Sequence, residues 1–162
     1  MVVPHRLPVT QKDHFNCMDI SVVMSTYNRS SVLGQALDAL TAQDAGGLSY
    51  EVITVDNNSA DSPRQVVESY SQRDRRIRYV LETKQGVAYG RNAGIAVARG
   101  EYIAFCDDDV VVRPDWLRNS HAALLRMFRS FFVPTIVANS WPMRSNRCIG
   151  NRQAGSPTKF LS

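Results

Sequence analysis

The stretch YIAFCDDDVVVRPDWL (residues 102–117) begins with apolar residues and continues into three consecutive aspartates, Asp107, Asp108 and Asp109. The apolar part predicts a buried strand over residues 101–106. Carboxylates this close repel one another, and burying even one of them is costly unless a positive group compensates. One interpretation is a solvated acidic turn, since aspartate is common in turns. The other is a site for a hard divalent cation such as Mg²⁺, which binds carboxylate oxygens together with water and substrate phosphates. The position directly after a hydrophobic strand favours the cation site.

The residues before this stretch alternate between short apolar runs and helical patterns. They predict strands at 20–26, 50–55, 77–82 and 101–106, and helices at about 31–42, 63–71 and 87–99. We expect Ser30 or Ser31 to cap the first helix, Ser59 or Asp61 to cap the second, and Gly100 to end the third. Because the strands are apolar rather than alternating, the order β-α-β-α-β-α-β predicts a parallel sheet with helices on both faces.

Polar side chains follow three of the predicted strands at the point where each strand ends. These clusters are STYNR (25–29), DNNSAD (56–61) and DDD (107–109). Ligands of open α/β sheets bind beyond the carboxyl ends of the strands, where the strand order switches. We therefore expect the three clusters to share one edge of the sheet and to form a binding site there.

Three further residues have both a structural and a functional interpretation. Asp56 is either part of a helix N-cap region or a hydrogen-bond partner of a base or ribose. Asn57 offers a donor and an acceptor, which suits the edge of a pyrimidine. Arg91, within GVAYGRNAG (86–94), is either a surface arginine or a phosphate contact, for which guanidinium is well suited.

Length and composition indicate one domain of a soluble protein, with 162 residues, 44% hydrophobic and 21% charged. No apolar run is long enough to cross a bilayer, and the N-terminus lacks the apolar region of a signal peptide. Cys106 falls in a predicted strand and is expected to be a buried free thiol, which favours a reducing compartment. We expect a cytoplasmic protein, with peripheral membrane association left open.

Charge is divided unevenly along the chain. Residues 1–115 hold 12 Lys and Arg against 15 Asp and Glu, a net charge of −3, whereas residues 116–162 hold 7 Lys and Arg and no acid. A basic segment can bind nucleic acid or membrane phosphates. The basic run RDRRIR (73–78) has no aromatic residues between its charges, so we read it as a solvated face and expect no nucleic-acid partner.

Taken together, ISVVMSTYNR, YEVITVDNNSAD and GVAYGRNAGIAVARGEYIAFCDDDV followed by PDWL resemble the family 2 glycosyltransferases. The resemblance covers residues 19–128, with the motifs in order and at the usual spacing. It implies the GT-A fold, a Rossmann-like α/β/α arrangement in three layers with a mainly parallel sheet, here incomplete at the C-terminus. It also implies metal-assisted transfer of a sugar from a nucleotide-diphosphate sugar to an acceptor hydroxyl, with inversion.

The resemblance also assigns roles to the residues at the base-binding end of the site. Ser25, Thr26 and Tyr27 match the loop that lines the nucleotide base in the family. Asp56 matches the first residue of the family's acidic pair, and Asn57 stands where many members have the second aspartate, which binds uracil. That departure leaves the nucleotide open between UDP, GDP and dTDP.

At the diphosphate end, Arg91 matches a basic residue near the base and diphosphate. Asp107 and Asp109 match the two acids of the family's DxD motif. Asp109 is then the principal ligand of Mg²⁺ or Mn²⁺, and Asp107 is a ribose contact and second metal ligand. Asp108 fills the variable middle position and is counted with the nucleotide-sugar contacts.

The general base of the reaction has no candidate in the sequence. Attack by an acceptor hydroxyl needs such a base, normally a carboxylate, and no residue after Asp115 is acidic. The resemblance stops near Arg129, so we expect a leader at 1–18, a donor-binding half at 19–128, and an irregular basic tail at 129–162 that is truncated or frame-shifted. The alternatives are a short subfamily that takes its base from another chain, or a nucleotide-sugar-binding protein without catalysis. The acceptor is unknown.

Overall fold

The computed structural model describes residues 18–130 and 159–161. Its elements are β1 (Met18–Thr26), α1 (Ser30–Thr41), β2 (Tyr50–Asp56), α2 (Pro63–Ser71), β3 (Ile77–Leu81), α3 (Val87–Val97), β4 (Gly100–Asp107), α4 (Trp116–Ser130) and β5 (Lys159–Leu161). The predicted alternation of strands and helices is confirmed. The predicted leader at 1–18 and tail at 129–162 lie almost wholly outside the described residues, and these boundaries stay a prediction.

The strands form one parallel sheet in the order β3-β2-β1-β4-β5. The chain first builds outward from β1 to β3 and then places β4 on the other side of β1, so the strand order switches between β1 and β4. Along the carboxyl edge, Thr26 pairs with Asp56, and Ser25 pairs with Asp107. The three predicted polar clusters therefore do meet at one edge of the sheet.

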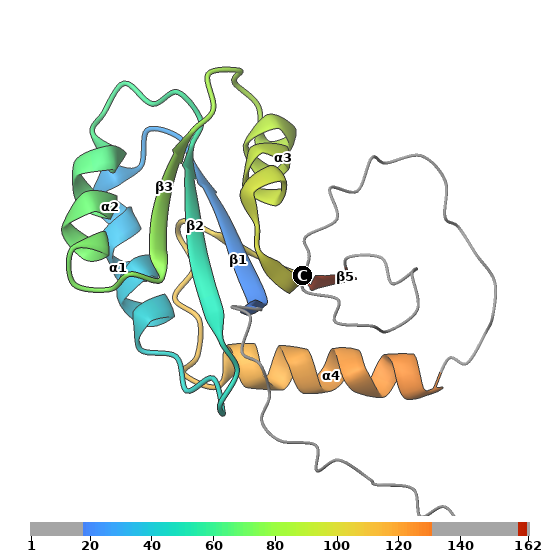
Figure 1. Cartoon of the computed structure of the whole chain (residues 1–162). Helices are drawn as coiled ribbons and strands as arrows, with labels where there is room; N and C mark the ends of the chain where they lie inside the picture. Colours follow the sequence, from blue (N-terminus) through green and yellow to red (C-terminus); the bar gives the residue numbers. More distant parts are fainter. Residues whose placement is uncertain (1–17, 131–158, 162) are drawn as a thin grey trace, which may run out of the picture.

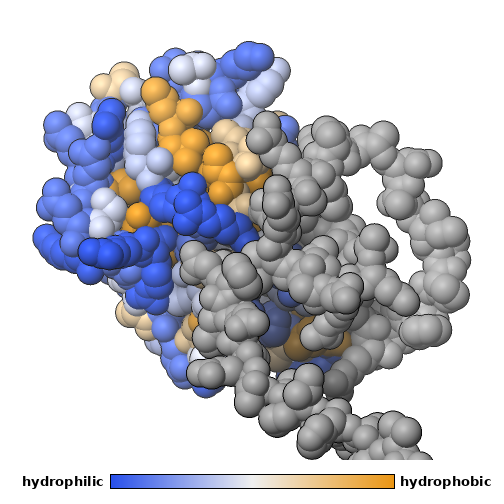
Figure 2. Space-filling view, viewed as in Figure 1, coloured by the Kyte–Doolittle hydropathy of each residue, from blue (hydrophilic) through white to orange (hydrophobic). Residues whose placement is uncertain are grey.

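Helices cover both faces of the sheet, as predicted (Figure 1). The larger core lies on the face covered by α1, α2 and α4, where Leu37, Val67 and Leu117 pack against the strands. On the other face, α3 packs against the smaller cluster around Val23 and Ile53. On the side drawn in Figure 2, apolar surface gathers over the sheet beside α3, and the surface over α1 and α2 on the left is largely hydrophilic. None of the described helices combines the length and apolarity needed to cross a bilayer.

The predicted helix caps are wrong in detail. Ser30 and Ser31 do not cap α1, because its N-cap is Arg29 and the backbone N–H of Ser30 donates to Asp61 Oδ2 at 2.7 Å. Asp61 therefore stabilises the start of α1 instead of α2, whose N-cap is Ser62 without a side-chain bond. A carboxylate at a helix N-terminus is favourable for either helix, and the approach of the two loops at this edge selects α1.

Gly100 was predicted to end α3, but the C-cap is Ala98 and Gly100 begins β4. A Cβ at position 100 would overlap the backbone nitrogen of Ser21 and lie 2.6 Å from the carbonyl carbon of Ile20. Close approach of β4 to β1 therefore explains the glycine better than helix termination does.

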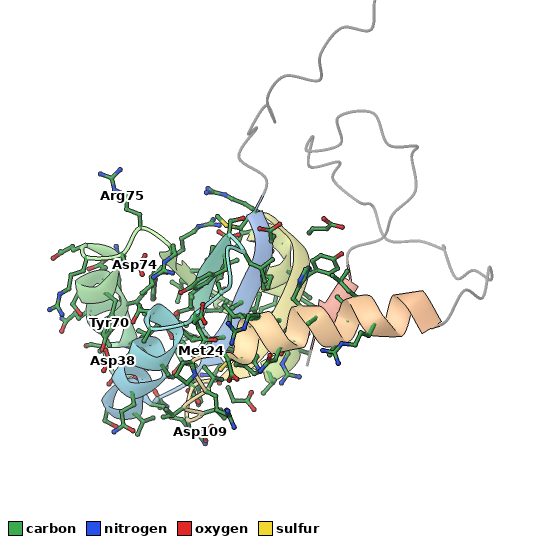
Figure 3. All side chains as sticks on the ribbon, turned by 90° about the horizontal axis from the view of Figure 1, so that it is seen from below. Met24, Asp38, Tyr70, Asp74, Arg75 and Asp109 are labelled. Atoms are coloured by element: carbon green, nitrogen blue, oxygen red, sulfur yellow. The ribbon has the colours of Figure 1, made fainter. Side chains whose placement is uncertain are left out.

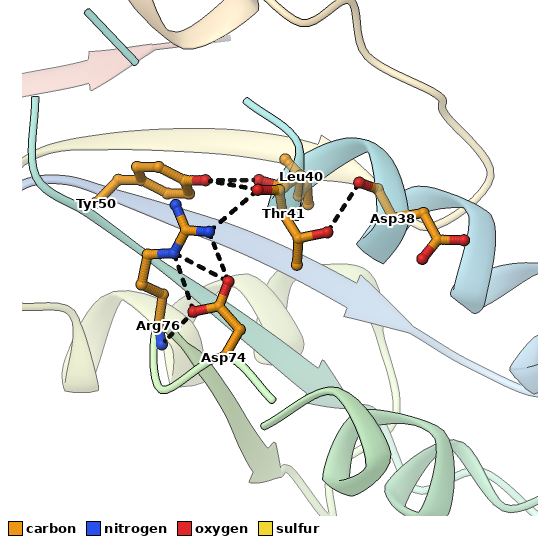
Figure 4. A network of polar contacts seen from close by, with 6 residues as sticks. All are labelled: Asp38, Leu40, Thr41, Tyr50, Asp74 and Arg76. Carbon is orange, nitrogen blue, oxygen red and sulfur yellow. Dashed lines mark hydrogen bonds and ion pairs between the residues drawn. The ribbon is translucent and has the colours of Figure 1, made fainter. Parts of the chain in front are cut away.

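A polar clasp holds the end of α1 to the starts of β2 and β3 (Figure 4). The hydroxyl of Tyr50 donates to the carbonyl of Leu40 at 2.9 Å, and Arg76 Nη2 donates to the carbonyl of Thr41 at 3.1 Å. Arg76 binds both carboxylate oxygens of Asp74, and its guanidinium lies 4.4 Å from the centre of the Tyr50 ring. The clasp forms at the amino end of the strands, away from the polar clusters.

A second polar contact joins the last turn of α1 to the last turn of α2. The hydroxyl of Tyr70 donates to Asp38 Oδ1 at 2.7 Å, and Figure 3 shows the two side chains side by side, whereas Arg75 points away from the protein. Tyr70 thus links α2 to α1 close to the end of α1 that the clasp also holds.

The clasp predicts a dependence of stability on acid pH. Hydrogen bonding from Arg76 holds the pKa of Asp74 below its ordinary value. Because the folded pKa is lower than the unfolded pKa, this stabilisation is present above the ordinary aspartate pKa of about 4 and is lost as pH falls through the folded value. We expect Asp74→Asn to be less stable than wild type near pH 7 and to show a shallower loss of stability below about pH 4. Urea unfolding followed by circular dichroism between neutral and acid pH measures this, and parallel curves would contradict it.

Candidate functional site

A cleft of about 380 Å³ opens at the carboxyl edge of the sheet, above the switch between β1 and β4. Its walls come from the ends of β1, β2 and β4 and from α3. The lining residues are Val23, Ser25, Thr26, Tyr27, Arg29, Asn57, Val87, Arg91, Cys106, Asp107, Asp108 and Asp109. All site residues predicted from the sequence line this cleft except Asp56. The functional roles assigned to them stay predictions.

The three aspartates after β4 face different surroundings. The side chains of Asp107 and Asp109 are 70% and 53% exposed, whereas that of Asp108 is 7% exposed. Asp109 lies in the loop before α4 (Figure 3). The acidic cluster is therefore neither a fully solvated turn nor a buried triad, because one carboxylate is buried and two face the cleft.

Two arginines supply the positive charge that the acidic cluster requires. Arg29 Nη1 donates to Asp109 Oδ2 at 2.7 Å and to Asp108 Oδ1 at 3.2 Å. Arg91 Nη2 lies 3.6 Å from Asp107 Oδ1, and its guanidinium stacks over Phe105. The charge of Asp108, followed by the bond to Asp109, raises the pKa of Arg29 further above its ordinary value.

Arg29 is a cleft residue that no motif in the sequence marks by itself. Seventy-nine residues separate it from Asp108, so no local pattern connects them. The only available signal was its position inside STYNR, at the end of a strand that was predicted to adjoin the acidic strand.

A divalent cation has suitable but incomplete ligands in this cleft. In residues 18–130 and 159–161, no group of three or more His, Cys, Asp or Glu side chains is arranged to hold a metal ion. Asp107 and Asp109 nevertheless expose carboxylates to the same cleft. Mg²⁺ is commonly held by one or two carboxylates, with water and substrate phosphates as the other ligands. The residues therefore fit a cation that is shared with a bound diphosphate.

Asp56 is buried beneath the edge of the cleft and is held by its neighbours. It accepts a hydrogen bond from the Tyr79 hydroxyl at 2.7 Å and from the backbone N–H of Ser59 at 2.9 Å. Burial, together with the bond to Asp56, raises the pKa of Tyr79 to about 12. Tyr79 thus stays a hydrogen-bond donor across the neutral range and fixes the orientation of the Asp56 carboxylate.

Asn57 holds the loop that leads into α3. Its Nδ2 donates to the carbonyl of Lys84 at 2.7 Å, and its Oδ1 accepts the backbone N–H of Gly86 at 2.7 Å. Gly86 has a φ of 135°, which side-chain-bearing residues rarely adopt. An amide carries two N–H donors and two acceptor lone pairs, so one of each is left for a ligand. Base recognition by Asn57 stays a prediction.

An apolar wall faces the charged side of the cleft. Tyr27 is about half exposed and its hydroxyl accepts a hydrogen bond from Gln85 Nε2 at 3.0 Å, and Val87 is also exposed.

Cys106 is a buried free thiol, as predicted. Burial, and then the charges of the aspartates that follow it, raise the Cys106 pKa to about 11. The thiol is therefore protonated at neutral pH and is a poor nucleophile.

Comparison with known proteins identifies the family. The family model described as Glycosyl transferase family 2 matches residues 21–152. The chain belongs to this family. The match runs from within β1 through α4 and includes the cleft, so the resemblance seen in the sequence motifs is confirmed.

The chain is also similar in sequence to curated bacterial proteins. The validoxylamine A glucosyltransferase of Streptomyces hygroscopicus subsp. limoneus is 38% identical over 106 residues, covering 64% of this chain and 23% of the relative. The succinoglycan biosynthesis protein ExoO of Rhizobium meliloti is 39% identical over 101 residues, covering 62% of this chain and 28% of the relative. The chain thus spans about a quarter of the length of these relatives.

Solved structures of glycosyltransferases have a similar fold. TarS 1–349 of S. aureus in complex with UDP-GlcNAc matches with a TM-score of 0.59 and 28% identity, covering 67% of this chain and 32% of TarS. The mannosyltransferase PcManGT of Pyrobaculum calidifontis, in complex with GDP-Man and Mn²⁺, matches with a TM-score of 0.57 and 27% identity, covering 63% and 31%. The predicted GT-A class is therefore confirmed.

Proposed function

We propose that this chain binds a nucleotide-diphosphate sugar in the cleft and transfers the sugar to an acceptor hydroxyl, with inversion at the anomeric carbon. The observation that carries the proposal is the convergence of family-motif side chains from four elements on one cleft at the strand-order switch. The S. aureus and Pyrobaculum relatives, solved with UDP-GlcNAc and GDP-Man, support this class of ligand. The base stays open between uracil, guanine and thymine.

The β1 end of the cleft suits the nucleoside. The half-exposed ring of Tyr27 offers a face for base stacking. The hydroxyl of Thr26 is buried and has no hydrogen-bond partner in the described part of the chain. A ligand group that bonded to this hydroxyl would remove the penalty of an unpaired polar group. Ser25 completes this wall. Asn57 would contact the base and ribose from the neighbouring strand, and Asp56, which does not line the cleft, would support this end through its bonds to Tyr79 and Ser59.

The β4 end suits the diphosphate. Arg91 would contact a phosphate, since guanidinium matches phosphate geometry with two parallel hydrogen bonds. Asp109, with Asp107, would hold Mg²⁺ or Mn²⁺ against the phosphates, and Asp108 would keep the acidic turn in place through its buried bond to Arg29. When bound, the cation supplies Lewis-acid stabilisation of the charge that develops on the leaving diphosphate.

A second candidate function is donor binding without transfer. It is favoured by one observation: each aspartate that lines the described cleft is paired with an arginine, which leaves none as a free general base. Release of labelled sugar from the donor, with and without acceptor alcohols, separates the two functions. Binding without any release would favour the second candidate.

Nucleoside diphosphate binding is expected to depend on Asp109 and on metal. We expect wild type to bind UDP, GDP or dTDP about tenfold more tightly with Mn²⁺ than without it, because carboxylate and phosphate oxygens complete the coordination together. Asp109→Asn is expected to lose this gain. Titration calorimetry of both proteins measures the difference.

Glu68→Gln is a matched control for Asp109→Asn. Both substitutions convert a half-exposed acid to its amide. Glu68 lies on α2 outside the cleft, and its Oε1 is 2.7 Å from Arg64 Nε, the same distance as between Asp109 and Arg29. We expect Glu68→Gln to bind like wild type. Equal metal dependence in wild type and Asp109→Asn would refute the assignment of the ligand.

A further inference from the structure

We propose that Arg29 is an internal cation that competes with the divalent metal for Asp109, and that metal binding releases its guanidinium toward the diphosphate. The inference rests on the proposed function and adds a residue that controls how metal and nucleotide bind together. It starts from the pairing of Arg29 with two carboxylates of unequal burial.

Asp109, which lines the cleft, makes the shorter of the two carboxylate contacts of Arg29. Arg29 Nη1 lies 2.7 Å from Asp109 Oδ2, closer than its 3.2 Å contact with Asp108 Oδ1. A divalent cation bound to the Asp109 carboxylate would meet a full positive charge within a few ångströms, and the two would repel. Cation and guanidinium therefore exclude one another at this carboxylate.

The two carboxylates need Arg29 to different degrees. Asp108 is almost fully buried, and its loss of hydration must be compensated by a charged partner. Asp109 is half exposed and retains water as a partner. A metal can thus displace Arg29 from Asp109 while the bond to Asp108 persists, so displacement need not leave a buried charge unpaired.

The backbone beneath Arg29 is held, whereas its side chain is half exposed. The preceding residue, Asn28, has a φ of 53°, and its backbone N–H donates to Ser59 Oγ while its Oδ1 accepts the N–H of Ala60. The next residue, Ser30, is bound to Asp61. The guanidinium can therefore move by side-chain rotation without disturbing the start of α1.

Arg29 has hydrogen-bonding capacity left for a phosphate. A guanidinium carries five N–H donors, and both contacts with the aspartates use Nη1. Within residues 18–130 and 159–161, Nε and Nη2 have no hydrogen-bond acceptor. Arg29 and Arg91 both line the cleft, and Arg91 is paired with Asp107. Two guanidinium groups would then flank a diphosphate, a geometry that suits its two phosphates.

The decisive experiment measures Mn²⁺ binding to the full chain without nucleotide, from the electron paramagnetic resonance signal of free Mn²⁺. We expect Arg29→Gln to bind Mn²⁺ about tenfold more tightly than wild type, because the competing charge is gone. Arg29→Met also removes the charge and should bind Mn²⁺ as tightly as Arg29→Gln does. A wild-type circular dichroism spectrum shows that a variant is folded, and one folded neutral variant is enough to decide the test. Arg29→Lys keeps the charge and should bind Mn²⁺ like wild type.

Arg64→Gln is the matched control, since Arg64 is exposed and bound to Glu68 on α2, outside the cleft. It should leave Mn²⁺ affinity unchanged. Folded Arg29→Gln or Arg29→Met with Mn²⁺ affinity equal to or below that of Arg64→Gln would overturn the inference. A tenfold gain in Arg29→Lys would overturn it too, because charge would not be the cause.

A second titration separates this inference from the proposed function. With Mn²⁺ present, UDP, GDP and dTDP should bind wild type more tightly than Arg29→Gln, since the variant has no guanidinium to release. Equal nucleotide affinity in both would overturn the released-guanidinium step while the proposed function stands. No nucleotide binding by wild type would instead refute the proposed function, whatever the Mn²⁺ result.

Discussion

Glu51→Ala is expected to lower the free energy of unfolding by about 3–5 kcal/mol, the loss typical of breaking a buried ion pair. Glu51 is only 2% exposed, and its Oε2 accepts from Arg78 Nη1 at 2.7 Å. Its Oε1 accepts from Ser21 Oγ at 2.8 Å and from the backbone N–H of Arg99 at 2.7 Å. Removal of the carboxylate leaves the buried Ser21 hydroxyl without its acceptor and Arg78 without its anionic partner. Urea unfolding followed by circular dichroism gives the change directly.

The position of Glu51 makes the prediction specific. Ser21 and Glu51 are paired on neighbouring strands at the amino end of the sheet, opposite the cleft. Arg78 Nη1 also donates to the carbonyl of Val97, so the network fixes the end of α3 to the strands. Glu68→Ala, which removes an exposed carboxylate, should change stability by less than about 0.5 kcal/mol. A loss below about 1 kcal/mol in Glu51→Ala would mean that water replaces the carboxylate.

Local patterns in the sequence predicted the fold well because the strands are mainly apolar and do not alternate. Residues 50–56 are buried throughout, as in a strand of a covered parallel sheet, although Glu51 lies among them. The order of elements then placed the polar clusters at one edge, since parallel strands end together. The family motifs added the GT-A class, which the comparisons confirm.

The sequence could not predict the partners of the polar side chains. Asp61 is a good N-cap residue for the helix that follows it, yet it caps α1, whose first residue lies 31 positions earlier. The same limit applies to Arg29, whose partners lie 79 and 80 residues away. Such contacts depend on the distance between two loops, which follows from strand order and not from local propensity. The roles of the cleft residues toward a ligand remain predictions.

The arginine pairs change the interpretation of the acidic cluster. Asp107, Asp108 and Asp109 suggested a need for a bound cation, and Arg29 and Arg91 meet much of that need within the chain itself. In the proposed binding mode, a metal and a diphosphate would bring opposite charges, so each arginine would exchange a carboxylate for a phosphate with little change in net charge. Joint binding of metal and nucleotide would then be favoured over binding of either one alone.

Gly94→Ala is expected to lower the free energy of unfolding by about 1–3 kcal/mol, the usual range for overpacking a core. A Cβ at this position would overlap Val23 Cγ1 and lie 3.2 Å from both Val23 Cγ2 and Val55 Cγ2. β-Branched side chains on strands have few alternative rotamers, so α3 must move away from the sheet. Alanine favours the helix by about 1 kcal/mol over glycine, so any net loss reports the steric conflict.

The same movement should weaken nucleotide binding, because Arg91 lies one turn before Gly94 on α3 and faces the cleft. Thermal unfolding and calorimetry with the preferred nucleoside diphosphate and Mn²⁺ measure the two effects. The double variant Val23→Ala/Gly94→Ala should recover nucleotide affinity relative to Gly94→Ala, since shortening Val23 makes room for the new methyl group. If Gly94→Ala is as stable as wild type and binds nucleotide equally well, α3 does not rest on the sheet closely enough to position Arg91.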